Sequence, residues 1–97
     1  MEEDLRKIRN WASHGTPRQF LAEVTAKVAG VGYTAELDGN TLTVFAEHRE
    51  GGFLGIGAKK IRDTKLQVIF GQDEVSIPDD TADPEFIQHL LGLLTAH

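Results

Sequence analysis

The sequence predicts an α+β fold: two N-terminal helices, a four-stranded antiparallel sheet made of two hairpins, and a C-terminal helix packed on one face. The first observation is a change in apolar spacing, from helical over residues 2–29 to alternating from Tyr33 onward. The second is turn punctuation at Asp38-Gly39-Asn40 and again at Gly71-Gln72-Asp73. No strand–helix–strand crossover occurs in the middle of the chain, which disfavours a parallel sheet.

Two helices are expected before the sheet. Over residues 2–13, apolar side chains form one stripe at helical spacing: Leu5, Ile8, Trp11 and Ala12. The second helix begins at Thr16-Pro17-Arg18-Gln19, which has the form of a capping box with proline at the first helical position. Gly30 and Gly32 end it. Its buried face consists of Phe20, Leu21, Val24 and Val28.

Four strands and a last helix follow. The first two strands flank Asp38-Gly39-Asn40, the third places Leu66, Val68 and Phe70 on one face, and Val75 with Ile77 forms a short fourth strand. Pro78 ends that strand because proline cannot donate to the ladder. Asp83-Pro84 then begins the final helix. Its apolar face is wide enough for packing on the sheet: Phe86, Ile87, Leu90, Leu91, Leu93 and Leu94.

Length and composition limit the class of protein. With 97 residues, 40% of them hydrophobic and 26% charged, the chain suits a single small α+β domain over residues 1–97. It has no apolar run long enough to cross a bilayer and no secretory signal, so we expect a cytoplasmic protein without membrane contact. The absence of cysteine excludes disulfides, thiol nucleophiles and cysteine–metal sites.

Charge is distributed unevenly along the chain. The net charge is −5, yet residues 1–65 hold all ten Lys and Arg against nine acidic residues. Residues 66–97 carry six acidic residues and no Lys or Arg: Asp73, Glu74, Asp79, Asp80, Asp83 and Glu85. A solvated acidic surface explains this third of the chain, and a surface for a basic partner is the alternative.

Catalytic chemistry has little support in the sequence. Neither serine, Ser13 or Ser76, lies in a nucleophile elbow, and the four histidines lack metal-ligand spacing. Glu85 and His89 are four residues apart on the last helix, which an exposed helical pair explains better than acid–base catalysis. Asp79-Asp80 suits a turn better than a cation site. We therefore expect no enzyme, with no catalytic residue, cofactor or metal.

Residues 47–62 are the unusual segment, with four of the ten glycines beside a cluster of cations. Nucleotide binding is weakly supported, since Ala58 precedes Lys59 where a phosphate loop needs glycine next to lysine. Two interpretations remain for Phe53, Leu54 and Ile56. They either plug one end of the core, with the glycines allowing the bends, or dock into a partner that the flanking cations steer.

Residues 52–60, Gly-Phe-Leu-Gly-Ile-Gly-Ala-Lys-Lys, resemble the G-F-L-G-[IL]-G-[AS]-K segment in the N-terminal domain of the Jag family of bacterial RNA-associated proteins. A looser similarity extends over residues 16–70, where that family has a helix before the segment and a strand after it. RNA binding in the family is attributed to two C-terminal domains, one of the KH type, whose signatures are absent here. The resemblance implies an accessory or protein-interaction module.

These sequence features agree with three functions. The leading hypothesis is a small non-catalytic protein-interaction module that binds another protein, or itself, through the Gly-rich apolar loop 51–60. Its partner-binding residues are Phe53, Leu54, Ile56, Arg49, Lys59 and Lys60. A nucleic-acid-associated domain is the alternative, disfavoured by a pI near 5.2. Its basic edge would consist of Arg49, Lys59, Lys60, Arg62 and Lys65. The third is an acidic chaperone-like dimer that offers residues 73–85 to a basic client.

Overall fold

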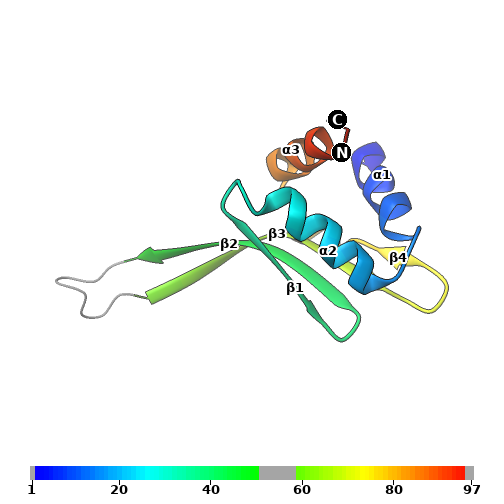
Figure 1. Cartoon of the computed structure of the whole chain (residues 1–97), viewed down its shortest axis with the longest axis horizontal. Coiled ribbons are helices and arrows are strands. Elements are labelled where there is room, and N and C mark those ends of the chain that lie inside the picture. The colour runs from blue at the N-terminus through cyan, green and yellow to red at the C-terminus, as the bar shows by residue number, and fades with distance from the viewer. Residues whose placement is uncertain (1, 51–58, 96–97) are drawn as a thin grey trace.

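The structure is a computed structural model that describes residues 2–50 and 59–95. Its helices and strands follow one another in the order α1 (Glu2–Ala12), α2 (Pro17–Val28), β1 (Tyr33–Asp38), β2 (Thr41–Glu50), β3 (Lys59–Phe70), β4 (Val75–Ser76) and α3 (Pro84–Thr95). The strands form one antiparallel sheet in the order β1-β2-β3-β4, and the three helices lie together on one side of it (Figure 1). The predicted α+β fold is confirmed.

The second helix begins as its capping box predicts. The Thr16 hydroxyl accepts a hydrogen bond from the Gln19 backbone N–H at 3.1 Å, and the Gln19 side chain accepts one from the Thr16 N–H at 2.9 Å. Two backbone donors at the helix start are thereby satisfied. Pro17 occupies the first helical position, where the missing N–H costs nothing. The local sequence therefore determines where α2 begins.

The core lies between the helices and one face of the sheet. Leu42 and Val44 of β2 and Leu66 and Val68 of β3 are fully buried on that face. The helices cover them with side chains that recur at helical spacing: Leu5, Ile8, Phe20, Val24, Val28, Phe86, Ile87 and Leu90. Burying side chains of this size contributes about 1.5–3 kcal/mol each. The other face of the sheet, the open face, is turned away from the helices.

The first hairpin agrees with the prediction and the fourth strand does not. Gly39 takes a φ of +60° in the two-residue turn between β1 and β2, a conformation that glycine adopts without a steric cost. The fourth strand contains only Val75 and Ser76, so the prediction that Ile77 belongs to it is wrong. Ile77 leaves the ladder and turns into the core, where it is 7% exposed.

The predicted loop 51–60 also needs correction. Lys59 and Lys60 are the first residues of β3, and Arg49 lies in β2, so three of the predicted loop contacts belong to paired strands. Both strands are longer than the sequence predicts, and the additional residues of β2 pair only with those of β3. Figure 1 shows β2 and β3 running out beyond the three helices. The part of the glycine-rich segment that joins the strands, residues 51–58, lies outside the described residues.

Candidate functional site

The β2–β3 ribbon, defined as Glu47–Glu50 paired with Lys59–Arg62, is the candidate site. Strand β1 begins at Tyr33, which pairs with Ala46, so no third strand borders the ribbon among the described residues. A two-stranded ribbon is only marginally stable in water, and edge strands are where a sheet can pair with another chain. Such an extension can offer hydrogen bonds and side chains to a partner.

The six predicted partner-binding residues fall into two groups. Arg49 and Lys60 are directly opposed in the register of the ribbon, and Lys59 opposes Glu50. Phe53, Leu54 and Ile56 lie outside the described residues. Both interpretations of these apolar residues, as a core plug and as a docking site, therefore stay predictions. What the structure adds is the position of the two strand ends between which they lie in the sequence.

Arg62 lies at the base of the ribbon, on the open face of the sheet, and contacts side chains of β1 and β2. Its guanidinium is 3.3 Å from the Glu36 carboxylate of β1 and 3.7 Å from that of Glu47 in β2. It also lies 4.6 Å from the centroid of the Phe45 ring, a cation–π contact. Phe45 is only 2% exposed yet does not belong to the main core cluster. The Arg62 side chain therefore covers an apolar ring at the point where three strands become two.

Lys65 occupies a bulge in β3 and ties α3 to the sheet. Val44 pairs with Leu66 and Phe45 with Thr64, so Lys65 is the extra residue of the ladder. Its carbonyl accepts a hydrogen bond from the Asp83 N–H at 2.9 Å, and its ammonium lies 3.0 Å from Asp63 and 3.1 Å from Asp83. Hydrogen bonds to Asp63 and Asp83 raise the pKa of Lys65, and the bond from Lys65 lowers the pKa of Asp83.

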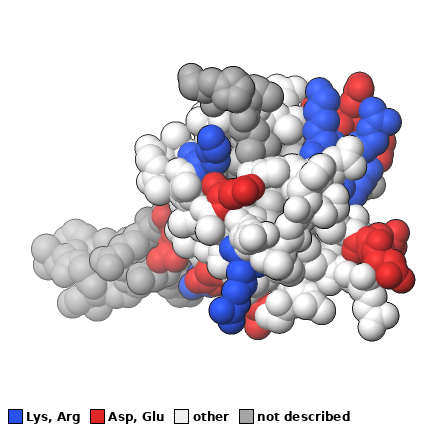
Figure 2. Space-filling model, turned by 45° about the vertical axis from the view of Figure 1, so that its right-hand side comes forward, with Lys and Arg blue, Asp and Glu red and all other residues white. Residues whose placement is uncertain are grey.

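The predicted basic edge is thus divided. Arg62 and Lys65 each stand between two carboxylates, which reduces the positive potential they can offer to a phosphate. On the face shown in Figure 2, blue side chains of the described residues stand beside red ones instead of forming one basic area. The strand register places the other three cations of this edge, Arg49, Lys59 and Lys60, at the far end of the ribbon.

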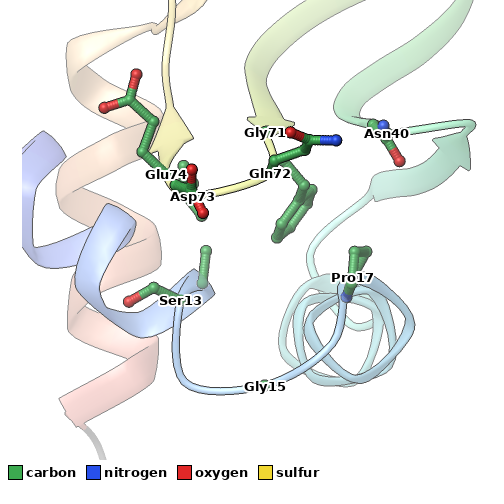
Figure 3. Close-up of a pocket in the computed structure, with 11 residues that line it drawn as sticks. Ser13, Gly15, Pro17, Asn40, Gly71, Gln72, Asp73 and Glu74 are labelled. Atoms are coloured by element: carbon green, nitrogen blue, oxygen red, sulfur yellow. The ribbon is translucent and has the colours of Figure 1, made fainter.

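Among the pockets elsewhere on the described surface, two bring several polar side chains together. One, of about 460 Å³, is bordered by the α1–α2 connection and by the β1–β2 and β3–β4 turns, which lie at the same end of the sheet (Figure 3). Its polar side chains come from Ser13, Asn40, Gln72, Asp73 and Glu74. The other, of about 540 Å³, contains Tyr33, Lys65, Asp83, Phe86 and His89. Neither combines a nucleophile with a base in hydrogen-bond contact, the minimum for covalent catalysis.

Glu85 and His89 are both exposed, and no hydrogen bond joins them. Within residues 2–50 and 59–95, no three carboxylates or histidines come together as metal ligands. No described helix is both long enough and apolar enough to cross a bilayer.

Comparison of the chain with protein-family models, with curated proteins and with solved structures gives no match. The resemblance of residues 52–60 to the Jag N-terminal domain therefore stays a prediction.

Sequence reasoning missed the length of the ribbon and both charged clusters at its base. One signal was present: Glu47 opposes Arg62 and Glu50 opposes Lys59, so opposite charges flank the glycine-rich segment symmetrically. The bulge at Lys65 had no comparable signal. Its partner Asp83 lies 18 residues further along the chain, and its place in the register shows only once the strands are paired.

Proposed function

We propose that the chain is a small non-catalytic protein-interaction module that binds a partner through the β2–β3 ribbon and the segment 51–58 that joins its strands. One observation carries the proposal: β2 and β3 continue past Tyr33, the first residue of β1, without adding to the core. Of the ribbon side chains that the structure describes, Glu47, Ile61 and Arg62, none belongs to the buried cluster. A paired extension that stabilises no core suits a role outside the fold.

The residues of the ribbon suggest the chemistry of the partner. Arg49 opposes Lys60, and like charges across a ladder are unfavourable unless something else neutralises them. The joining segment adds three large apolar residues, Phe53, Leu54 and Ile56. A protein with an apolar pocket and an acidic rim would satisfy both features. The proposed setting is the bacterial cytoplasm, in line with the resemblance and with a chain that has no cysteine.

The test is a double substitution in the joining segment. Phe53→Ser with Leu54→Ser is expected to abolish capture of the partner while the melting temperature stays nearly the same. The partner is identified by a photo-crosslinking side chain at position 53 in cells of the source organism. A crosslinker at the exposed Gln72, on the far side of the sheet, reports the background.

A matched control removes apolar surface from the body instead of the ribbon. Val31 is 42% exposed, so Val31→Ser should leave capture unchanged. A large fall in melting temperature in the Phe53/Leu54 variant would contradict the proposal, because it would mean that these residues plug the core. Equal capture by the variant and the unmodified chain would contradict it as well.

Nucleic-acid association is the second candidate, and the opposed pair Arg49 and Lys60 favours it. If the ribbon binds phosphate, fluorescence anisotropy of labelled single-stranded RNA and of duplex DNA should show affinity that falls steeply with salt. Lys59→Glu with Lys60→Glu should then abolish binding. Arg62→Gln is the control, since Arg62 is already neutralised by two carboxylates and should matter little. Flat titrations at low salt would remove this candidate.

A further inference from the structure

The outer edge of β1 is open. The sheet ends at β1 on one side and at β4 on the other, and no described strand lies beyond either. The β4 edge is protected, because that strand has two residues and Pro78 follows closely. In contrast, β1 has six residues, no proline and an unbroken register with β2. Of the devices that usually prevent an edge strand from pairing with another chain, β1 has only the charges of Glu36 and Asp38.

The ladder determines which residues of β1 point outward. The Phe70 N–H donates to the Asn40 carbonyl at 2.8 Å, so even-numbered residues at this end of β2 bond to β3. The odd-numbered residues of β2 must therefore bond to β1, through its partners Thr34, Glu36 and Asp38. The backbone groups of the other three residues of β1 face away from the sheet: Tyr33, Ala35 and Leu37.

We propose that two copies of the chain pair through their β1 strands, antiparallel about a two-fold axis at Ala35, to form one continuous sheet. In this register Ala35 opposes Ala35 of the second copy, and Tyr33 opposes its Leu37. Every one of these residues has outward backbone groups, so each pair can exchange two hydrogen bonds. The same patch serves both copies, as a two-fold interface requires.

The charge of Glu36 favours the register with its axis at Ala35 over the register with its axis at Glu36. A two-fold axis at Glu36 would keep the hydrogen-bonding pattern but would place the Glu36 carboxylates of the two copies directly opposite each other. The axis at Ala35 instead places Glu36 opposite Thr34 of the second copy. Both side chains are exposed on the open face, and the Thr34 hydroxyl can donate to the carboxylate. An axis at Thr34 would pair fewer residues of the strand.

The helix above this edge leaves room for a second copy. Helix α2 lies over β1, and α1 covers one flank of it, where Trp11 packs on Phe20 and donates to Glu23. The helical period places Leu21, Thr25 and Ala29 on the opposite flank, which carries one charge, that of Arg18. A flank of small and apolar residues allows two α2 helices to approach across the extended sheet.

This pairing uses the strand at the opposite side of the sheet from β4 and none of the ribbon residues Glu47–Glu50. It therefore goes beyond the proposed partner site and can fail or succeed independently.

Sedimentation equilibrium from micromolar to millimolar concentration tests whether two copies pair through β1. The mass is expected to rise from that of one chain, 10.7 kDa, to twice that value. Ala35→Pro should abolish the rise, because proline has no N–H to donate, yet it should leave the fold intact since that N–H bonds to nothing within the sheet. A chain that remains a monomer at every concentration would overturn the proposal, as would a dimer that survives Ala35→Pro.

A second test examines the register of the β1 pairing. It also shows whether the two copies pair through β1 if the Ala35→Pro variant fails to fold. Thr34→Glu places like charges opposite each other twice per dimer, so the dissociation constant should rise roughly tenfold. Adding Glu36→Lys to that variant should restore it. Thr64→Glu, at an exposed threonine of β3, is the control and should have no effect. A dimer weakened by Phe53→Ser with Leu54→Ser but not by Thr34→Glu would assign self-association to the segment 51–58 and overturn the proposal.

Discussion

Replacing Phe45 with alanine is expected to lower the free energy of unfolding by about 3–5 kcal/mol, an effect as large as that of a central core position. The ring is 2% exposed although it lies outside the main core cluster, among the odd-numbered β2 residues that alternate with the core residues Leu42 and Val44. Its removal leaves a cavity under Arg62, whose guanidinium lies 4.6 Å from the ring. Urea unfolding followed by circular dichroism measures the change.

Two variants separate the burial of Phe45 from its contact with the cation. Phe45→Leu keeps most of the apolar volume and should cost much less than alanine. Arg62→Met keeps an apolar cover but loses the cation–π contact and two exposed ion pairs, which together are worth about 1 kcal/mol. If Phe45→Ala lowered the free energy of unfolding no more than Arg62→Met does, the result would mean that the open face does not bury this ring.

Most of the fold could be predicted because local signals and tertiary packing agree. The capping box at Thr16 and Gln19, the turn at Gly39 and the alternation of Leu42 with Val44 each determine a local geometry that the packed structure keeps. Ile77 is the instructive exception. Its alternation with Val75 is typical of a strand, but core burial competes with the ladder there, and burial decides the outcome.

The site was harder to predict because it depends on pairing between distant residues. Glycines in the segment 47–62 indicated a loop, and propensity alone could not tell that both ends of that segment pair with each other. The cations Arg62 and Lys65 looked alike in the sequence. Their carboxylate partners, Glu36 and Asp83, come from other elements, so their neutralisation becomes visible only in the folded chain.

Asp83→Ala is expected to destabilise the protein through two separate losses. Asp83 caps α3, since its carboxylate accepts a hydrogen bond from the Glu85 N–H at 3.0 Å, and loss of such a cap costs about 0.5–2 kcal/mol. The same carboxylate also pairs with Lys65, whose side chain is 19% exposed at the β3 bulge. Asp83→Asn keeps the cap and loses only the ion pair with Lys65. In urea unfolding at neutral pH, it should therefore lower the free energy of unfolding less than Asp83→Ala does.

The pH dependence distinguishes the two losses. Lys65 lowers the pKa of Asp83 in the folded state, so the stability from this pairing is present above the unfolded pKa of about 4 and is lost as the pH falls through the folded value. The cost of Asp83→Asn relative to the unmodified chain should therefore shrink below pH 4 or so. The difference between Asp83→Ala and Asp83→Asn should stay constant, because neither variant titrates at position 83. A constant cost of Asp83→Asn down to acid pH would instead show that the pairing of Asp83 with Lys65 does not stabilise the fold, and that Asp83 is linked to the bulge by the hydrogen bond from its N–H to the Lys65 carbonyl.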